Sequence, residues 1–306
     1  MTAAPEPILE DLAAAPPTAR RAPTRPLYWS IRRELWEHRS LYVVPLAAAA
    51  VVFTGFLLSL TGLAGDLRDA AAGAADNDLL TPYSFLALAL IVTGFAVGGL
   101  YCLSALHAER RDRALLFWKS LPVSDLTTVA AKAAIPLVVL PALIWGVTIA
   151  VHLVMLLVET LAALAGGLDV ARLWAHLPLV GIWGTLSYGL VANALWHAPV
   201  YAWLLMVSAW ARRTPVLWAL GPPLALCAIE ALAFKPGPFR AWLYHRLVGG
   251  PAEAFAQAVE GEKGLGPLPQ IDPLKFLSSP GLWVGLLMAA VFLAAAVRLR
   301  RRRQLT

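Results

Sequence analysis

The 306-residue sequence has few charged residues. Asp, Glu, Lys and Arg make up 14% of it, and 59% of its residues are hydrophobic. Soluble globular domains average about 25% charged residues. A surface with so few charges cannot face water over most of its area. The apolar residues also gather in long blocks, which indicates that most of the chain lies in a lipid bilayer.

Cysteine and the common catalytic motifs are also scarce. The two cysteines, Cys102 and Cys227, lie in apolar blocks without metal-ligand spacing. No GxxxxGK[ST] segment occurs, so the chain has no P-loop of its own for ATP. Neither an HExxH pattern nor a GxSxG nucleophile elbow is present. We therefore expect no metal, no cofactor and no catalytic residue, and the chain is not expected to be an enzyme.

Six apolar blocks are long enough, or nearly so, to cross a hydrocarbon core about 30 Å thick as helices. The sequence therefore predicts an all-α, polytopic membrane protein. Trp and Tyr gather near the block ends, as in an interfacial aromatic belt. The expected spans are residues 41–63, 80–106, 133–159, 177–210, 214–234 and 277–298.

The basic residues predict the orientation of the spans. With six spans, 18 of the 25 Lys and Arg residues fall on the side of the two termini. Since Lys and Arg favour the cytoplasmic side, both termini are expected there. Splitting the fourth block would move Arg212, Arg213 and the Arg-rich C-terminus outside, so we expect one long helix at 177–210. The basic ends need only anionic lipid as a partner, and no nucleic acid.

Outside the spans, four segments have a distinct character. Residues 1–26 are rich in Pro and Ala, which predicts a disordered cytoplasmic tail ahead of a six-helix transmembrane domain at 27–303. Residues 27–39 predict an amphipathic helix in the headgroup region. Residues 235–275 form the last extracytoplasmic loop, in which short helices are expected.

The fourth segment is the cytoplasmic loop at 107–128. An apolar patch, Ala114 to Trp118, stands within charged residues. Pro122 ends any helix there, and Ser124 or Asp125 is positioned to cap the helix that becomes the third span. Exposed apolar residues in a charged frame are typical of a surface that docks a partner. The same residues could instead dip into the membrane interface, and the pattern alone leaves both interpretations open.

Four ionisable residues lie within or at the ends of the spans: His152, Glu159, His197 and Glu230. Such groups are candidates for a transport or catalytic role because burying them in lipid is costly. Glu159 and Glu230 lie near span ends rather than at the midplane, where a proton-coupled carrier needs its acids. We therefore favour helix-packing hydrogen bonds for all four. The alternative hypothesis of an intramembrane enzyme would be tested by alanine substitution of these residues.

The segment from Glu109 to Asp125, ERRDRALLFWKSLPVSD, resembles a segment of bacterial ABC-2-type transporter permeases. In that family it follows the second span and is commonly close to ERRDRSILFWKSLPVSD. The resemblance extends to the helix before span one, the six spans and the basic C-terminus, over about residues 27–303. It implies an ABC-2-type permease fold with an N-terminal amphipathic elbow helix.

The resemblance also implies a function and partners. Such permeases are dimers in the bacterial inner membrane, and a separate cytoplasmic ABC ATPase subunit binds the ATP. The loop between spans two and three passes the motion of the ATPase to the membrane helices, usually for export. The elbow helix, through Arg32, Arg33 and Glu34, would add a second contact. By position, the loop contact would be formed by Glu109, Arg110, Arg111, Asp112, Arg113, Phe117, Trp118 and Lys119.

A second hypothesis is a membrane scaffold or regulatory subunit that binds a cytoplasmic partner without transport. It shares every feature given so far. The sequence leaves open the substrate, the direction of transport, the role of the 235–275 loop, and whether the second permease copy is identical or a paralogue.

Overall fold

The structure, a computed structural model, is helical throughout the part of the chain that it describes. Six helices or helix runs are long and apolar enough to cross a membrane. Among the described residues, no strand is present, and the one β-type pairing is an isolated bridge between Phe255 and Ile271. These findings confirm an all-α protein of multi-pass membrane character. The described residues are 25–62, 65, 79–111, 124–233, 237–256 and 270–302.

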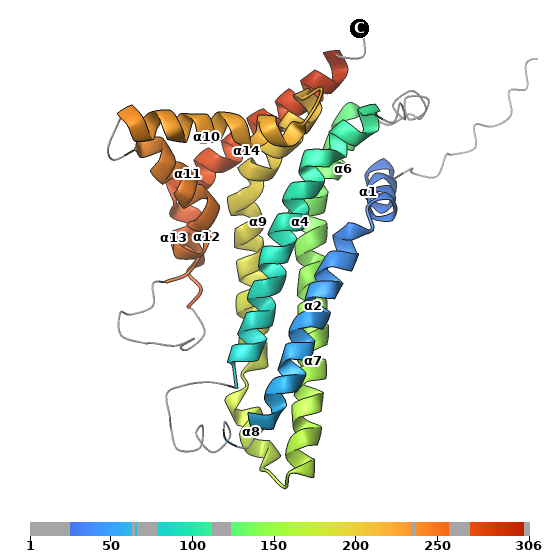
Figure 1. Cartoon of the computed structure of the whole chain (residues 1–306), viewed down its shortest axis with the longest axis vertical. Coiled ribbons are helices and arrows are strands. Elements are labelled where there is room, and N and C mark those ends of the chain that lie inside the picture. Colours follow the sequence, from blue (N-terminus) through green and yellow to red (C-terminus); the bar gives the residue numbers. More distant parts are fainter. Residues whose placement is uncertain are drawn as a thin grey trace, which may run out of the picture.

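Four long helices lie side by side as a bundle (Figure 1). They surround a core of fully buried side chains such as Tyr83, Leu86, Leu90 and Met155. A 3-10 turn, Leu60–Gly62, follows the first of them, and a short helix, α8 (Val170–His176), lies at one end of the bundle. The four are α2 (Ser40–Ser59), α4 (Thr81–Arg111), α7 (Leu140–Ala165) and α9 (Leu179–Trp210).

The third span is longer than the predicted 133–159. It begins with α6 (Asp125–Ala134) and passes through a π-helical turn, η2 (Ile135–Val139), into α7. Ser124 caps it, as predicted: its Oγ accepts a hydrogen bond from the Thr127 N–H at 3.1 Å. Pro136 lies in the π turn, where its missing N–H removes one helical hydrogen bond and favours a local widening.

The fourth apolar block is one helix, as the charge distribution predicted. α9 continues through Pro199 without a break. Arg212 and Arg213 follow its end and precede α10 (Pro215–Ala233). The absence of charged residues between Leu179 and Trp210 explains why no turn interrupts it.

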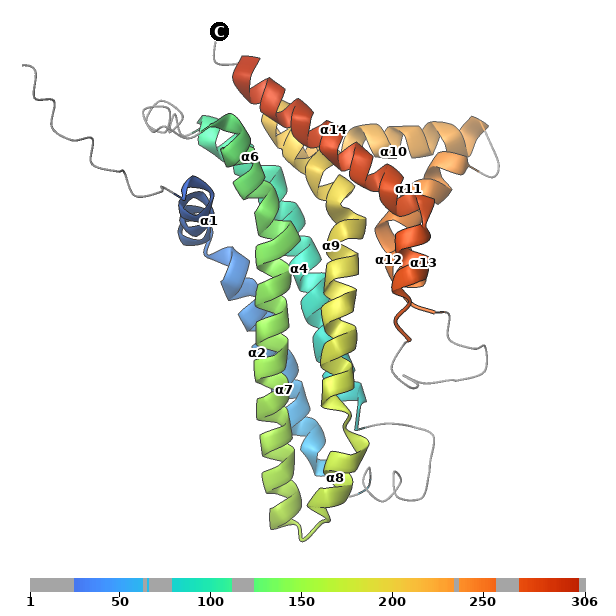
Figure 2. The same cartoon turned by 180° about the vertical axis from the view of Figure 1, so that it is seen from behind.

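α10 meets the length and hydropathy criteria for a span, but it runs across the bundle axis (Figures 1 and 2). The Trp203 indole N–H of α9 donates to the Ala219 carbonyl at 3.1 Å and holds α10 near its N-terminal end. Beyond α10, the chain forms α11 (Pro238–Val248), α12 (Gly250–Ala254) and α13 (Pro273–Ser278).

The described part of the predicted 235–275 loop lies beside α9, away from the bundle end at α8 (Figure 2). Arg246 of α11 is 4% exposed and donates to the carbonyls of Trp196 (3.2 Å) and Gly281 (2.6 Å). Its guanidinium also stacks 4.3 Å from the Trp196 ring centroid. One arginine thus joins α11 to α9 and to the last helix, α14 (Pro280–Arg302), which returns along α9.

The turn into α11 predicts a specific sensitivity to substitution. The Glu230 carboxylate accepts hydrogen bonds from the N–H groups of Phe239 (2.6 Å) and Arg240 (2.7 Å), which caps α11. A Cβ at Gly237 would lie 2.6 Å from a Glu230 carboxylate oxygen. We expect Gly237→Ala to lower the free energy of unfolding by about 1–3 kcal/mol, measured in detergent micelles. Gly221→Ala is the matched control, since its Cβ meets nothing within 4 Å; an equal loss in both variants would contradict this account.

Candidate functional site

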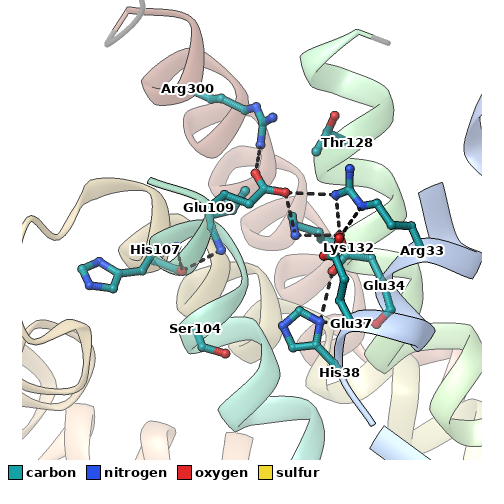
Figure 3. Close-up of polar contacts among 12 residues, drawn as sticks. Arg33, Glu34, Glu37, His38, Ser104, His107, Glu109, Thr128, Lys132 and Arg300 are labelled. Carbon is teal, nitrogen blue, oxygen red and sulfur yellow. Dashed lines mark hydrogen bonds and ion pairs between the residues drawn. The ribbon is translucent and has the colours of Figure 1, made fainter. Parts of the chain in front are cut away.

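A cluster of charged side chains joins four elements at the bundle end opposite α8. It lies where α1 (Pro26–Glu37), the end of α4, the start of α6 and the last turns of α14 meet (Figure 3). α1 is the helix predicted at 27–39. Its Ile31 and Leu35 pack onto the core between these helices, whereas Leu27 and Trp36 are exposed. The charge cluster consists of Arg33, Glu34, Glu109, Asp125, Lys132 and Arg300.

The centre of the cluster is an ion pair between Glu34 and Lys132. Both side chains are 1% exposed, and Lys132 Nζ lies 2.8 Å from Glu34 Oε1. The Tyr101 hydroxyl of α4 donates to Glu34 Oε2 at 2.7 Å. Arg33 donates to Oε1 at 2.9 Å. Each oxygen of this buried carboxylate is therefore paired, which burial of a charge requires.

Glu109, near the end of α4, connects the centre to the last helix. Its Oε1 lies 3.1 Å from Arg33 and 3.1 Å from Lys132, and its Oε2 lies 2.7 Å from Arg300. The Arg300 guanidinium also contacts Asp125, the first residue of α6, at 2.8 Å. The predicted 107–128 loop is shorter than expected, because α4 extends to Arg111 and α6 begins at Asp125. Arg300 thus bridges the two helix ends that flank the remainder of this loop. A displacement of this loop would act directly on α4, α6 and α14.

The cluster balances its charges, with three carboxylates and three cations. Burial alone raises the pKa of the Glu34 carboxyl, but the Lys132 ammonium, the Tyr101 hydroxyl and Arg33 outweigh it, so this pKa lies below its ordinary value of 4.5. Glu34 therefore stabilises the fold in its ionised form.

This pKa predicts how stability depends on pH. Because the folded-state pKa of Glu34 is lower than the unfolded-state value, its contribution is complete above about pH 4.5 and is lost as the pH falls through the folded-state value. We expect the melting temperature of the wild type to fall below pH 4.5 more steeply than that of Glu34→Gln. Parallel melting curves for the two proteins over this range would contradict the assignment.

The cluster does not form a metal site of its own. Glu34, Glu37 and His38 have ligand atoms within 4.8 Å of one another. Both Glu34 oxygens, however, are already occupied by Lys132 and Tyr101. The lysine ammonium takes the place that a cation would need.

The structure brings together three of the residues predicted as sites. Arg33, Glu34 and Glu109 belong to the charge cluster, whereas the exposed Arg32 lies over the rings of Trp29 and Trp36, on the other side of α1. Arg110 and Arg111 form the last turn of α4. The other predicted loop residues lie outside the described part of the chain: Asp112, Arg113, Phe117, Trp118 and Lys119.

Four cluster partners were not predicted as site residues: Tyr101, Asp125, Lys132 and Arg300. Lys132 carried a usable signal, because it is the one charged residue between Asp125 and Glu159. A cation inside an apolar helix needs a partner. Arg300 carried none, since it stands among four other arginines at the C-terminus.

The ionisable residues within the spans all have partners in the chain. Tyr83 donates its hydroxyl to Glu159 at 2.8 Å. The Trp183 indole donates to His152 Nδ1 at 3.2 Å, so the Nε2 of that ring carries the proton and donates to the Tyr83 carbonyl at 3.1 Å. His197 Nε2 lies 3.2 Å from the Leu247 carbonyl. With Glu230 capping α11, all four predicted residues form the helix-packing contacts favoured for them.

No protein-family model matches the chain, and neither a curated protein nor a solved structure is similar to it at a significant level. The six apolar helices and the buried ion pairs define the class of the protein: a helical, multi-pass membrane protein with a buried charge cluster at one end of its bundle.

Proposed function

We propose that the chain is the permease subunit of an ATP-driven transporter and works with a separate cytoplasmic ABC ATPase subunit. The observation that carries this proposal is the charge cluster. It ties the amphipathic helix α1, both ends of the 107–128 loop and the last span into one unit. Such a unit is suited to receive force at the loop. The likeness of Glu109 to Asp125 to the ABC-2-type permease segment supports the same function.

In this mechanism the ATPase docks on the 107–128 loop at the cytoplasmic end of the bundle. Closure of the ATPase around ATP displaces the loop, and Glu109 and Asp125 move with its two ends. Arg300 contacts both carboxylates, so α4, α6 and α14 shift together rather than separately. The coupled shift changes the relative populations of two arrangements of the spans and opens a path across the membrane.

The proposal includes an orientation and an assembly. The excess of Lys and Arg places both termini in the cytoplasm of a bacterial cell, with the spans in its inner membrane. Two permease copies, or this chain and a paralogue, form the pathway between them. Export is the direction that the resemblance favours.

The test is reconstitution of the full-length chain in proteoliposomes with a candidate ABC ATPase subunit from the same organism. We expect the permease to stimulate ATP hydrolysis. Trp118→Ala and Arg111→Glu are each expected to lower the stimulated rate of ATP hydrolysis about tenfold. The first removes an apolar anchor of the loop, and the second removes a positive charge at its rim. Arg298→Glu is the control, since this exposed arginine lies at the same end of the molecule outside the loop.

Two results would separate the rival functions. A scaffold or regulatory subunit would bind the ATPase, but the loop variants would leave the rate of hydrolysis unchanged. An intramembrane enzyme would lose activity when His152 or Glu159 was changed to alanine, with or without the ATPase. Either result would contradict the permease assignment.

A further inference from the structure

A cavity of about 640 Å³ lies at the turn between α9 and α10, apart from the charge cluster. Its volume is in the range of small-molecule sites, which is about 300–1,000 Å³. The turn lies at the bundle end that also carries α1 and the end of α14 (Figure 1). The cavity is lined by Trp210, Ala211, Arg212, Arg213, Thr214 and Trp218.

The cavity carries positive charge that no described residue neutralises. Arg212 and Arg213 are exposed, and neither forms an ion pair with a described residue. In the charge cluster, by contrast, Arg33 contacts three carboxylates and Arg300 contacts two. Two adjacent guanidinium groups suit an oxyanion with several acceptor oxygens, above all a phosphate.

Two tryptophans form an apolar wall beside these charges. The rings of Trp210 and Trp218 meet edge to face with centroids 4.8 Å apart. Tryptophan is enriched where membrane helices pass the headgroup level. Leu217 and Leu220 of α10 are also exposed, and they offer an apolar surface next to the arginines. An anionic group that carries an acyl chain matches both features.

The cavity is held in place by the ends of α4 and α9. The Ser208 hydroxyl accepts hydrogen bonds from the N–H groups of Leu106 (3.1 Å) and His107 (3.0 Å). His107 Nδ1 lies 3.3 Å from the Ala211 carbonyl. Thr214, a β-branched residue, has a φ of +45°, in the left-handed region that such residues rarely adopt. A turn fixed in this way presents its two arginines in one arrangement.

We propose that this cavity binds a phosphate group, either in the headgroup of an anionic phospholipid or in a soluble phosphate compound. Phosphate binding in this cavity does not require the ATPase. The cavity lies beside α4, next to a point in that helix that is two residues before Glu109. Its occupancy would therefore bear on the helix end that the charge cluster holds.

The experiment is native mass spectrometry of the full-length protein in detergent, titrated with phosphatidylglycerol, phosphatidylcholine or inorganic pyrophosphate. We expect Arg212→Gln/Arg213→Gln to weaken phosphatidylglycerol binding roughly thirtyfold, while phosphatidylcholine binding is unchanged. Arg298→Gln/Arg302→Gln is the matched control. It removes two exposed arginines from the same end of the molecule and should cost less than threefold.

Pyrophosphate binding that depends on the same two arginines, without lipid selectivity, would support the phosphate site and identify a soluble source. Equal losses in the test and control variants would overturn the proposal, because a general attraction to basic ends would then explain the binding. Unchanged binding of both phosphate probes in Arg212→Gln/Arg213→Gln would also overturn it. Melting curves of all variants show whether each one is folded.

Discussion

Replacing Lys132 with methionine is expected to lower the free energy of unfolding by about 3–5 kcal/mol. Methionine fills a similar volume, so the change removes the charge with little loss of packing. Glu34 would then be left 1% exposed, with its nearest cation gone. Arg33 would remain 2.9 Å from Glu34, but it also serves Glu109, so the cluster would hold one negative charge in excess of its cations. A buried charge left in excess is the cause of so large an effect. Unfolding in mixed detergent micelles measures it.

The double variant Glu34→Gln/Lys132→Met separates loss of the pair from loss of packing. Without both charges, the site has no unpaired ion, and the amide can still accept a hydrogen bond from Tyr101. We expect the double variant to recover at least half of the stability lost in Lys132→Met. If it were as unstable as the single variant or less stable, the energetic role given to the pair would be wrong.

If the chain works as the proposed permease, Glu109→Gln should uncouple it from the ATPase with little effect on its assembly. Glu109 contacts Arg33, Lys132 and Arg300, and a neutral amide would weaken all three contacts. The 107–128 loop would still dock, but its motion would reach α14 less completely. In proteoliposomes with the ABC ATPase, we expect stimulated ATP hydrolysis to fall about tenfold, within the usual range of coupling between sites.

The matched control for this variant is Glu37→Gln. Glu37 contacts Arg33 at 3.5 Å from the exposed rim of the cluster, where 45% of its side chain is open to solvent. A surface pair of this kind contributes little, so the variant should keep close to the full rate. Equal losses in Glu37→Gln and Glu109→Gln would mean that total charge, and not the bridge at Glu109, decides the rate.

The long helices could be predicted from the sequence because apolar blocks without charge have few alternatives in a membrane. The same holds for α9, since a break would have moved Arg212 and Arg213 away from the side on which most Lys and Arg residues are expected. The cap at Ser124 was also predictable, because such a cap depends only on neighbouring residues. For the apolar blocks and the cap, the determining information is local in the sequence; for α9 it is the distribution of Lys and Arg along the whole chain.

The direction of α10 and the centre of the charge cluster could not be predicted in this way. α10 has the hydropathy of a span, but its path across the bundle depends on its contacts with α9. Glu34 and Lys132 are 98 residues apart, and no spacing rule connects them. Only the resemblance to ABC-2-type permeases pointed to Glu34 and Glu109 as site residues.

The most direct test of the permease assignment is photo-crosslinking from the 107–128 loop in the native membrane. A photoreactive phenylalanine analogue would replace Trp118 in one variant of the full-length chain. In a second variant it would replace Trp174, an exposed residue of α8 at the opposite end of the bundle. We predict an ATP-sensitive adduct with a P-loop ATPase from position 118 and none from position 174. Adducts with lipid alone from position 118, or equal ATPase adducts from both positions, would contradict the assignment.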